Sequence, residues 1–481
     1  MYPLTGPGPR VAFIVDHPAR DLGGLVLVAA ELCRHGVTCH LVPLNLMHGQ
    51  LWTLAPDLVV LNYARPTNAR IARELLDAGI KVGVLDTEGA AWETLDAYSE
   101  LVWADRDQLH QLAFVCMWGP LLARHMVDQG LLLASQISVT GCPRFDFYHS
   151  RWRGVFDEGA TPQRPVLLIN TNFSLSNPRF ATAGRNREHL EKELGLGAER
   201  VTAYLRAEQA AMRGMIELAK SLAGDFPECE VVLRPHPFEE PTSYALEMAG
   251  CAGVTVDGSG PIQSRLSGSL AVIQRSCSTA AEAAMAGVPT LSPQWLPARA
   301  LIPFAEAVSV RCGSYQDMRA ELYRIMNGTG AARSATLAAR ENLSDWFAAS
   351  DGYAYRRVAD TIRAALPRER TVNEASCIAN LYQLSDPKQS RRQRIAARLR
   401  YALRLSPAWA FRHWRVADGA AWRQSDKYFG VEAVAHLVDR IALAMADHAL
   451  NPGKLRVVPA SSENRHGAPI RSHSVTLQAA E

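Results

Sequence analysis

Short apolar runs alternate with stretches of helical periodicity along the first 150 residues. The run RVAFIV at 10–15 is followed by the helical stretch LGGLVLVAAELC at 22–33, and the run KVGVL at 81–85 follows an amphipathic stretch that ends at Gly79. Short buried strands that alternate with helices are typical of a parallel sheet in a doubly wound α/β domain. We therefore expect one Rossmann-type domain over residues 1–155.

The same alternation restarts after a polar stretch, DEGATPQRP, at 157–165. It begins with VLLIN at 166–170, continues through CEVVLR at 229–234 and ends with helical residues, which predicts a second such domain over 156–366. Two Rossmann-type domains that face each other across a cleft form the GT-B architecture. The same outline also fits periplasmic binding proteins and some epimerases.

The pattern weakens beyond residue 366. We expect a basic helical extension over 367–455, and a disordered tail over 456–481 because this segment lacks periodicity and is rich in Ser, Arg and His. Within 388–415 a basic helix either packs on the domains with a solvated face or lies on an anionic membrane. Its arginines are Arg391, Arg392, Arg394, Arg398, Arg400 and Arg404.

Length and composition agree with a two-domain protein of the cytoplasm. A chain of 481 residues is too long for one ordinary core, and its nine cysteines are scattered without CxxC pairs, as in a reducing compartment. The net charge of +3 argues against nucleic acid as a partner. Since no signal peptide or bilayer-spanning run is found, we expect a cytoplasmic protein, with peripheral contact to the inner face of the cell membrane left open.

Polar residues follow the strands of the second domain, where open α/β sheets bind ligands. In VVLRPHP, Arg234 and His236 come directly after a strand, and two prolines stiffen the loop. This loop is either a surface turn or a phosphate site with charge-assisted hydrogen bonds. Asn170 and Asn172 end the first strand of this domain and are candidates for donor or acceptor contacts.

Hydroxyl side chains precede an alanine-rich helix in VIQRSCSTAAEAAMAG at 272–287. Ser276, Ser278 and Thr279 fit either an ordinary N-cap or an anion site completed by the backbone N–H groups of the first turn. Glu282 lies one turn into the helix, either as a capping-box partner or as an acceptor for a ribose hydroxyl.

Two acids end a strand of the first domain, in LDTEG at 85–89. Asp86 and Glu88 form either an acidic loop or a catalytic pair, in which two nearby charges raise the pKa of one carboxyl group and suit it to act as a base. His17 and Arg20 follow the first strand and lie near the expected cleft. They contact donor or acceptor there, unless His17 only caps the next helix.

RPHP at 234–237, with SCSTAAEAAMAGVP downstream, resembles the HP and S-S/T motifs of bacterial GT-B sialyltransferases and Kdo transferases. The chain from about 8 to 365, with DHPARDLGG, LDTEG, GCPRFDFY and LINTNFS, also resembles bacterial surface carbohydrate biosynthesis proteins. The resemblance implies a CMP-linked donor whose phosphate is held by His236 and the hydroxyl pair, and an acidic D/E-D/E-G motif. LDTEG departs from that motif at Thr87, and Glu88 matches the catalytic carboxylate best, with Asp86 as the supporting acid.

These features predict a metal-independent glycosyltransferase without a cofactor. It would move Kdo or another ulosonate from CMP to a growing surface polysaccharide or lipopolysaccharide, with a glycan or lipid-linked glycan as acceptor. Two alternatives stay open. One is a CDP-alcohol phosphotransferase of the teichoic-acid polymerase kind, with His17 as its catalytic histidine. The other is a non-catalytic, nucleotide-binding assembly protein.

Overall fold

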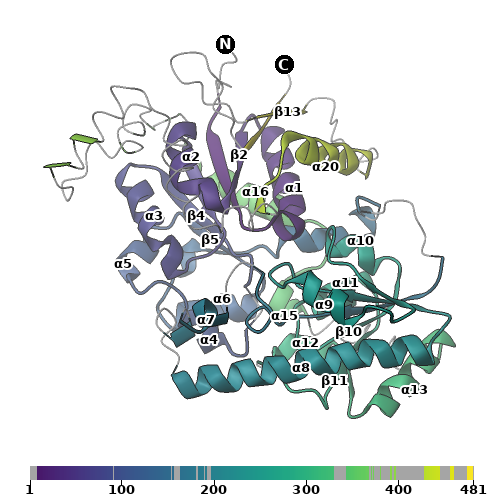
Figure 1. Cartoon of the computed structure of the whole chain (residues 1–481). Coiled ribbons are helices and arrows are strands. Elements are labelled where there is room, and N and C mark those ends of the chain that lie inside the picture. Colours follow the sequence, from purple (N-terminus) through teal and green to yellow (C-terminus); the bar gives the residue numbers. More distant parts are fainter. Residues whose placement is uncertain are drawn as a thin grey trace.

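Within the described residues, the computed structural model shows two α/β domains, one above the other, each built around its own sheet (Figure 1). The loops that follow the strands of both sheets meet at one pocket. This is the expected GT-B-like fold of two Rossmann-type domains that face a cleft. The structure describes residues 8–89, 92–152, 154–156, 163–179, 183–188, 190–191, 197–298, 300–329, 343–367, 370, 372, 377, 380, 391–392, 395–396, 427–444, 455–459 and 474–479.

Eight strands of the described residues form the sheet of the N-terminal domain, in the order β13-β14-β2-β1-β3-β4-β5-β6, and β2 to β6 pair in parallel. Successive side chains of β1 point to opposite faces, so Phe13 and Ile14 pack in separate cores, both covered by helices. The strands are β1 (Arg10–Val15), β2 (Thr38–Pro43), β3 (Leu58–Leu61), β4 (Lys81–Leu85), β5 (Phe114–Met117), β6 (Ile137–Val139), β13 (Leu455–Pro459) and β14 (Val475–Ala479). The helices are α1 (Gly23–Cys33), α2 (Met47–Leu54), α3 (Pro66–Asp77), α4 (Leu95–Ser99), α5 (Arg106–Leu109) and α6 (Pro120–Asp128), with short turns η1 (Pro18–Leu22), η2 (Leu44–Leu46), η3 (Ala134–Gln136), η4 (Pro143–Tyr148) and η5 (Ser150–Trp152).

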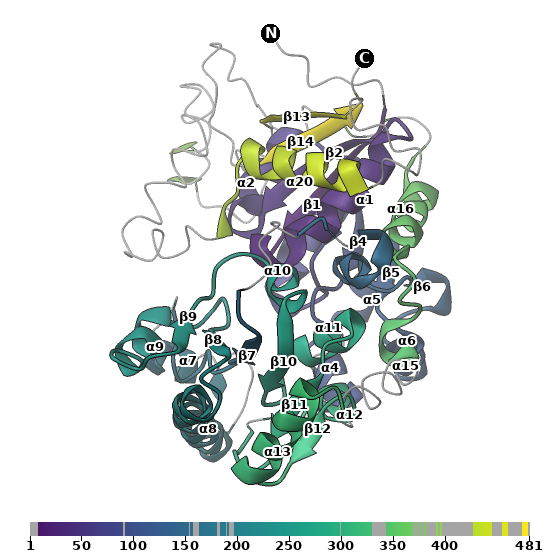
Figure 2. The ribbon, with the colours of Figure 1, turned by 90° about the vertical axis from the view of Figure 1, so that its right-hand side faces the viewer.

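Six strands of the described chain form the parallel sheet of the C-terminal domain, in the order β12-β11-β10-β7-β8-β9. The long helix α8 packs on one face of this sheet and is seen along its length in Figure 1 and end-on in Figure 2. The strands are β7 (Val166–Asn170), β8 (Glu230–Arg234), β9 (Val254–Val256), β10 (Ser269–Gln274), β11 (Thr290–Pro293) and β12 (Val310–Cys312). The helices are α7 (Ala183–Glu188), α8 (Ala198–Asp225), α9 (Pro241–Glu247), α10 (Ile262–Leu266), α11 (Thr279–Ala286), α12 (Pro303–Ala307) and α13 (Tyr315–Met326).

The chain then returns to the N-terminal domain. Helix α15 (Ser344–Phe347) packs on α6, while α16 (Ala354–Ala365) and α20 (Val431–Ala444) pack on α1. Asp146 fixes α16 by accepting the backbone N–H groups of Ala354, at 2.9 Å, and Tyr355, at 2.7 Å. The expectation that the second domain extends to residue 366 is therefore wrong for α16, because its apolar face is buried on the first domain, whereas Phe347 of α15 packs against residues of both domains.

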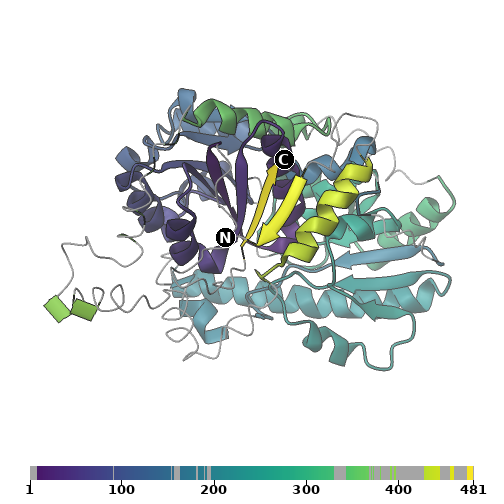
Figure 3. The same cartoon turned by 90° about the horizontal axis from the view of Figure 1, so that it is seen from above.

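The expectation of a disordered tail is also wrong for the described residues beyond 455. Strand β14 pairs antiparallel with β2, and β13 pairs with β14, so both extend the N-terminal sheet beside α20 (Figure 3). Val475 and Leu477 are buried there. Strand β14 covers the edge of β2, which would otherwise expose unpaired backbone groups.

The predicted basic helix at 388–415 lies outside the described residues except for 391–392 and 395–396. The packed-helix and membrane alternatives for this segment therefore both stay predictions. Where the structure describes the chain, none of its helices combines the length and the apolar character needed to cross a bilayer.

Candidate functional site

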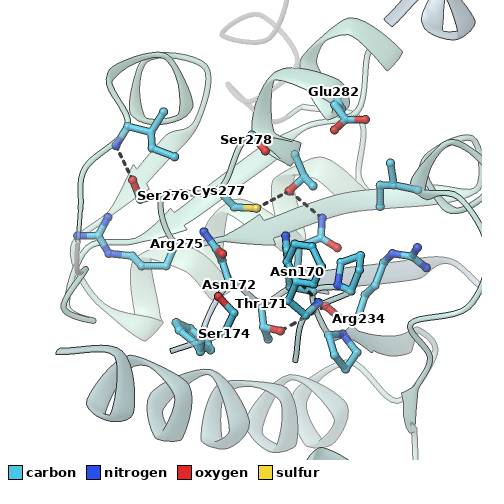
Figure 4. Close-up of a pocket in the computed structure, with 18 of the residues that line it drawn as sticks. Asn170, Thr171, Asn172, Ser174, Arg234, Arg275, Ser276, Cys277, Ser278 and Glu282 are labelled. Atoms are coloured by element: carbon cyan, nitrogen blue, oxygen red, sulfur yellow. Dashed lines mark hydrogen bonds between the residues drawn. The ribbon is translucent and has the colours of Figure 1, made fainter. Parts of the chain in front are cut away.

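A pocket of about 360 Å³ lies between the two domains and is lined by residues of both. Figure 4 shows residues that the C-terminal domain contributes to it. The N-terminal domain contributes residues from the loops after β1 and β4, and the C-terminal domain contributes loops after β7, β8 and β10 and the start of α11. Ten of the twelve predicted site residues line this pocket, while Asp86 and His17 do not. The ten are Arg20, Glu88, Asn170, Asn172, Arg234, His236, Ser276, Ser278, Thr279 and Glu282.

The three predicted hydroxyl residues at α11 have different roles. Ser276 has a left-handed backbone (φ 55°), and its Oγ accepts the backbone N–H of Ile302 at 2.6 Å, so it holds the loop. Ser278 is the N-cap residue of α11, yet its side chain makes no capping hydrogen bond. Thr279 Oγ1 accepts from Asn170 Nδ2 at 3.1 Å. The N-cap explanation therefore fails for the Ser278 hydroxyl, which lines the pocket instead.

The HP loop, residues 234–238, is held by hydrogen bonds between its side chains and backbone groups. Arg234 donates to the carbonyl oxygens of Ser259, at 2.8 Å, and Gly260, at 2.5 Å. Burial lowers the pKa of Arg234 to about 10, which leaves it charged at neutral pH. His236 Nδ1 accepts the backbone N–H of Phe238 at 3.2 Å, so the neutral ring carries its proton on Nε2 and can donate from there.

Glu282 is buried and accepts a hydrogen bond from the Tyr148 hydroxyl group of the N-terminal domain. Burial and the nearby Glu282 carboxylate raise the pKa of Tyr148 well above its usual value. Glu282 is the fourth residue after Ser278, beyond the position that a capping-box acid takes. It remains a candidate acceptor for a ligand hydroxyl.

Glu88 reaches the pocket from the opposite domain as a doubly paired carboxylate. Arg65 binds it at 2.6 Å and Arg20 at 3.1 Å. Burial acts to raise the pKa of Glu88, but the two guanidinium groups outweigh it and lower the pKa to about 2. The sequence predicts a raised pKa for one of the two acids, and Glu88 is not that acid, because sequence spacing did not show the arginines that pair with it.

Asp86 is the acid whose pKa is raised, mainly through burial. It accepts the Glu88 backbone N–H at 2.7 Å and a hydrogen bond from the Tyr98 hydroxyl group. Its own backbone carbonyl accepts from Trp118 at 2.6 Å. Asp86 thus shapes the loop that carries Glu88. This arrangement fits the predicted supporting role of Asp86 better than a direct contact between Asp86 and a ligand.

A chain of alternating charges extends behind Glu88. Arg20 binds Asp16 at 2.6 Å and Asp21 at 2.9 Å as well as Glu88. Lys427, from the C-terminal extension, lies with its Nζ 3.5 Å from Asp16 and 4.8 Å from the ring centre of Phe238 in the HP loop. The cation thus touches both domains beside the pocket.

His17 is buried behind the pocket, with its ring edge-on to that of Phe238 at 5.9 Å. It precedes η1, and its side chain makes no capping hydrogen bond, so the capping alternative for this residue is wrong. Its ring faces the HP loop across the domain boundary.

Sequence reasoning missed Arg65 and Lys427. Arg65 follows β3 and precedes Pro66, so the strand-end rule applied to the other loops would have found it. Lys427 lies in the extension without a motif, and only the fold brings it to the pocket. Among the described residues, no group of three or more His, Cys, Asp or Glu side chains has the geometry of a metal site.

No protein-family model matches the chain, and no curated protein matches it in sequence. Solved structures of similar shape include the UDP-GlcNAc 2-epimerase of Neisseria meningitidis bound to UDP-GlcNAc (13% identity, 74% of this chain and 100% of that chain, TM-score 0.46). Others are the wall teichoic acid polymerase TagF (11%, 75% and 90%, TM-score 0.48) and the calicheamicin glycosyltransferase CalG4 (15%, 75% and 98%, TM-score 0.40). These likenesses are distant, so the chemistry below is argued from the pocket alone.

Proposed function

We propose that the chain is a GT-B glycosyltransferase that takes its sugar from a nucleotide donor, with CMP-linked Kdo or another ulosonate as the donor. The acceptor would be a surface polysaccharide or lipopolysaccharide glycan, free or lipid-linked. One observation carries the proposal. A single pocket joins an ionised Glu88 from one domain to the HP loop and the start of α11 from the other.

The wall formed by the C-terminal domain suits a leaving phosphate. The backbone N–H groups of Ala280 and Ala281 in the first turn of α11 already donate to the carbonyl oxygens of Cys277 and Ser278. The donors that we assign to the phosphate are therefore the Ser278 hydroxyl, which makes no capping hydrogen bond, and His236 Nε2. Donors placed where negative charge develops stabilise a leaving group without a metal ion. We therefore propose that CMP departs from this wall, and that neither a metal nor a cofactor is required.

The ionised state of Glu88 favours nucleophilic attack over proton abstraction, the two roles open to a catalytic carboxylate. A pKa of about 2 makes it a poor base at neutral pH, so abstraction of the acceptor proton is disfavoured. As an ionised group it can attack the anomeric carbon while the bond from that carbon to the CMP phosphate oxygen breaks. The acceptor oxygen then displaces Glu88 and loses its proton to another base or to water, and the anomeric configuration is retained.

Nucleotide binding tests the proposal directly. Calorimetric titration with CMP, UDP and GDP, each with and without magnesium, should show that CMP binds most tightly and that magnesium makes no difference. Tighter binding of UDP or GDP would contradict the CMP donor, and binding that requires magnesium would contradict the metal-independent site. The absence of binding for all three nucleotides would contradict the proposal as a whole.

The position of His17 supports a second candidate, the CDP-alcohol phosphotransferase. Its ring lies against the HP-loop residue Phe238, so a histidine of the N-terminal domain does approach this loop. However, His17 is not among the residues that line the pocket. Two results together would favour this alternative over the glycosyltransferase. The wild type would release CMP from CDP-glycerol but not from CMP-Kdo, and His17→Ala would no longer release CMP from CDP-glycerol.

A further inference from the structure

Gln263 places an unsatisfied acceptor at the pocket. The side chain lies in α10, is only 9% exposed and lines the pocket. Its Oε1 is buried and has no hydrogen-bond partner within the part of the chain that the structure describes. Most buried polar atoms in proteins are paired, so an orphan acceptor beside a ligand pocket indicates a partner that the ligand supplies.

The neighbouring hydrogen-bond donor, the Arg234 guanidinium group, already binds other acceptors. Both terminal nitrogens of Arg234 bind the carbonyl oxygens of Ser259 and Gly260, in the loop just before α10. Glu282 adds acceptor oxygens and lies close enough to raise the pKa of Arg234 against the effect of burial. Figure 4 shows Arg234 and Glu282 toward the same end of the pocket. This end is therefore rich in acceptors and favours a ligand that brings donors.

A second orphan acceptor lies deeper in the same pocket. Asn170 is 4% exposed, its Nδ2 donates to Thr279, and its Oδ1 has no partner among the described residues. Asn170 ends β7, directly beside Arg234 in the register of the sheet. The atom of Asn170 that lacks a partner there is its amide oxygen, which accepts hydrogen bonds. A hydroxyl or amine donor fits it.

We propose that the end of the pocket at Gln263 is the nucleoside subsite, and that Gln263 Oε1 accepts a hydrogen bond from the exocyclic amine of cytosine. This inference rests on the proposed function and names the residue that selects its nucleotide. Cytosine carries an N4 amine where uracil carries the acceptor O4. With the Gln263 amide turned so that Oε1 faces the base, uracil would place one acceptor against another, which is costly in a buried site, whereas the ribose hydroxyls meet Glu282 with either base.

Two substitutions of Gln263 test this assignment through nucleotide binding. We expect the wild type to bind CMP at least about tenfold more tightly than UMP, the range that one well-placed hydrogen bond supplies. Gln263→Ala removes the acceptor, so the ratio should fall to about one through weaker CMP binding. Gln263→Glu offers only acceptors when ionised, so it should still bind CMP and still reject UMP. Gln111→Glu makes the same change at an exposed glutamine of the N-terminal domain and should leave the ratio unchanged.

The outcomes separate this inference from the proposed function. A CMP-to-UMP ratio that is unchanged in Gln263→Ala, or UMP binding that improves in Gln263→Glu, overturns the role of Gln263 but leaves a nucleotide-dependent transferase standing. AMP bound as tightly as CMP overturns recognition of cytosine. If the wild type binds none of these nucleotides, the proposed function and this inference both fail.

Discussion

Arg65 and Arg20 determine the protonation state of Glu88. Two carboxylates this close in sequence favour a raised pKa, yet the guanidinium groups at 2.6 and 3.1 Å reverse that effect at Glu88. Arg65 is itself fixed between aromatic rings, 4.7 Å from that of Tyr63 and 5.0 Å from that of Trp92. The arrangement keeps the carboxylate ionised and in place.

Loss of Arg65 should change the pH dependence of turnover. In Arg65→Met, the nearer of the two guanidinium groups that lower the pKa of Glu88 is lost, so this pKa rises from about 2 and the carboxylate protonates at a higher pH. The acidic limb of kcat/KM should therefore move to higher pH. Arg70→Met, which removes an exposed ion pair on the same helix, is the control. An acidic limb that does not move would show that Glu88 titration does not govern the reaction.

The wall formed by the C-terminal domain can be tested one side chain at a time. His236→Ala and Ser278→Ala should each weaken CMP binding by about 1–3 kcal/mol, measured by calorimetry, because each removes a hydrogen bond to a charged phosphate. Ser276→Ala is the contrasting variant, since its Oγ holds the Ile302 backbone; it should lower the melting temperature. CMP affinity that is unchanged in both binding variants, or a loss of affinity with EDTA, would contradict this wall as a metal-independent phosphate site.

At the scale of elements, the alternation of strands and helices was predictable, while the C-terminal strands were not. Strands such as β1, β7 and β10 carry apolar runs long enough to indicate buried strands. Strand β14 lies beyond the alternation of strands and helices, and its pairing with β2 depends on an edge that forms only in the folded sheet. The pocket loops were predictable for the same reason as the strands they follow. The ion pairs of Glu88 and the place of Lys427 were not, because both depend on contacts between distant segments.

The contact between β14 and β2 predicts a pH dependence of stability. His40 Nδ1 pairs with Thr476 at 2.8 Å, and burial, together with Arg10 and Arg370, lowers the pKa of His40 to about 3. An unfolded histidine takes up a proton near pH 6.5, so below that value the unfolded state binds more protons and the free energy of unfolding falls. From pH 6.5 to pH 5 this group should cost about 2 kcal/mol.

Denaturant unfolding at several pH values measures this effect. His40→Gln can keep a hydrogen bond to Thr476 but does not titrate, so its stability should fall less steeply with pH than that of the wild type. Parallel curves for the two proteins between pH 6.5 and pH 5 would show that His40 is not held neutral by the paired strands.

At the scale of the whole molecule, the basic segment at 388–415 leads to a prediction about membrane binding. We expect the protein to co-sediment with anionic but not zwitterionic vesicles, since each arginine near an anionic surface contributes about 1 kcal/mol. High salt should release it, and substitution of its six arginines by glutamine should abolish binding. The packed-helix alternative would instead give no binding at low salt. Binding that is insensitive to salt would also contradict the electrostatic account.

On the proposed function, Glu88 performs glycosyl transfer from a CMP-linked donor. The decisive measurement is turnover of CMP-Kdo by Glu88→Gln beside its affinity for CMP, with the exposed Glu100→Gln as control. The amide keeps the shape of the side chain but not its charge, so CMP release should fall by roughly 10²-fold or more while CMP affinity and folding stay near wild type. Near-normal turnover in Glu88→Gln, or its loss only in Asp86→Asn, would contradict the account.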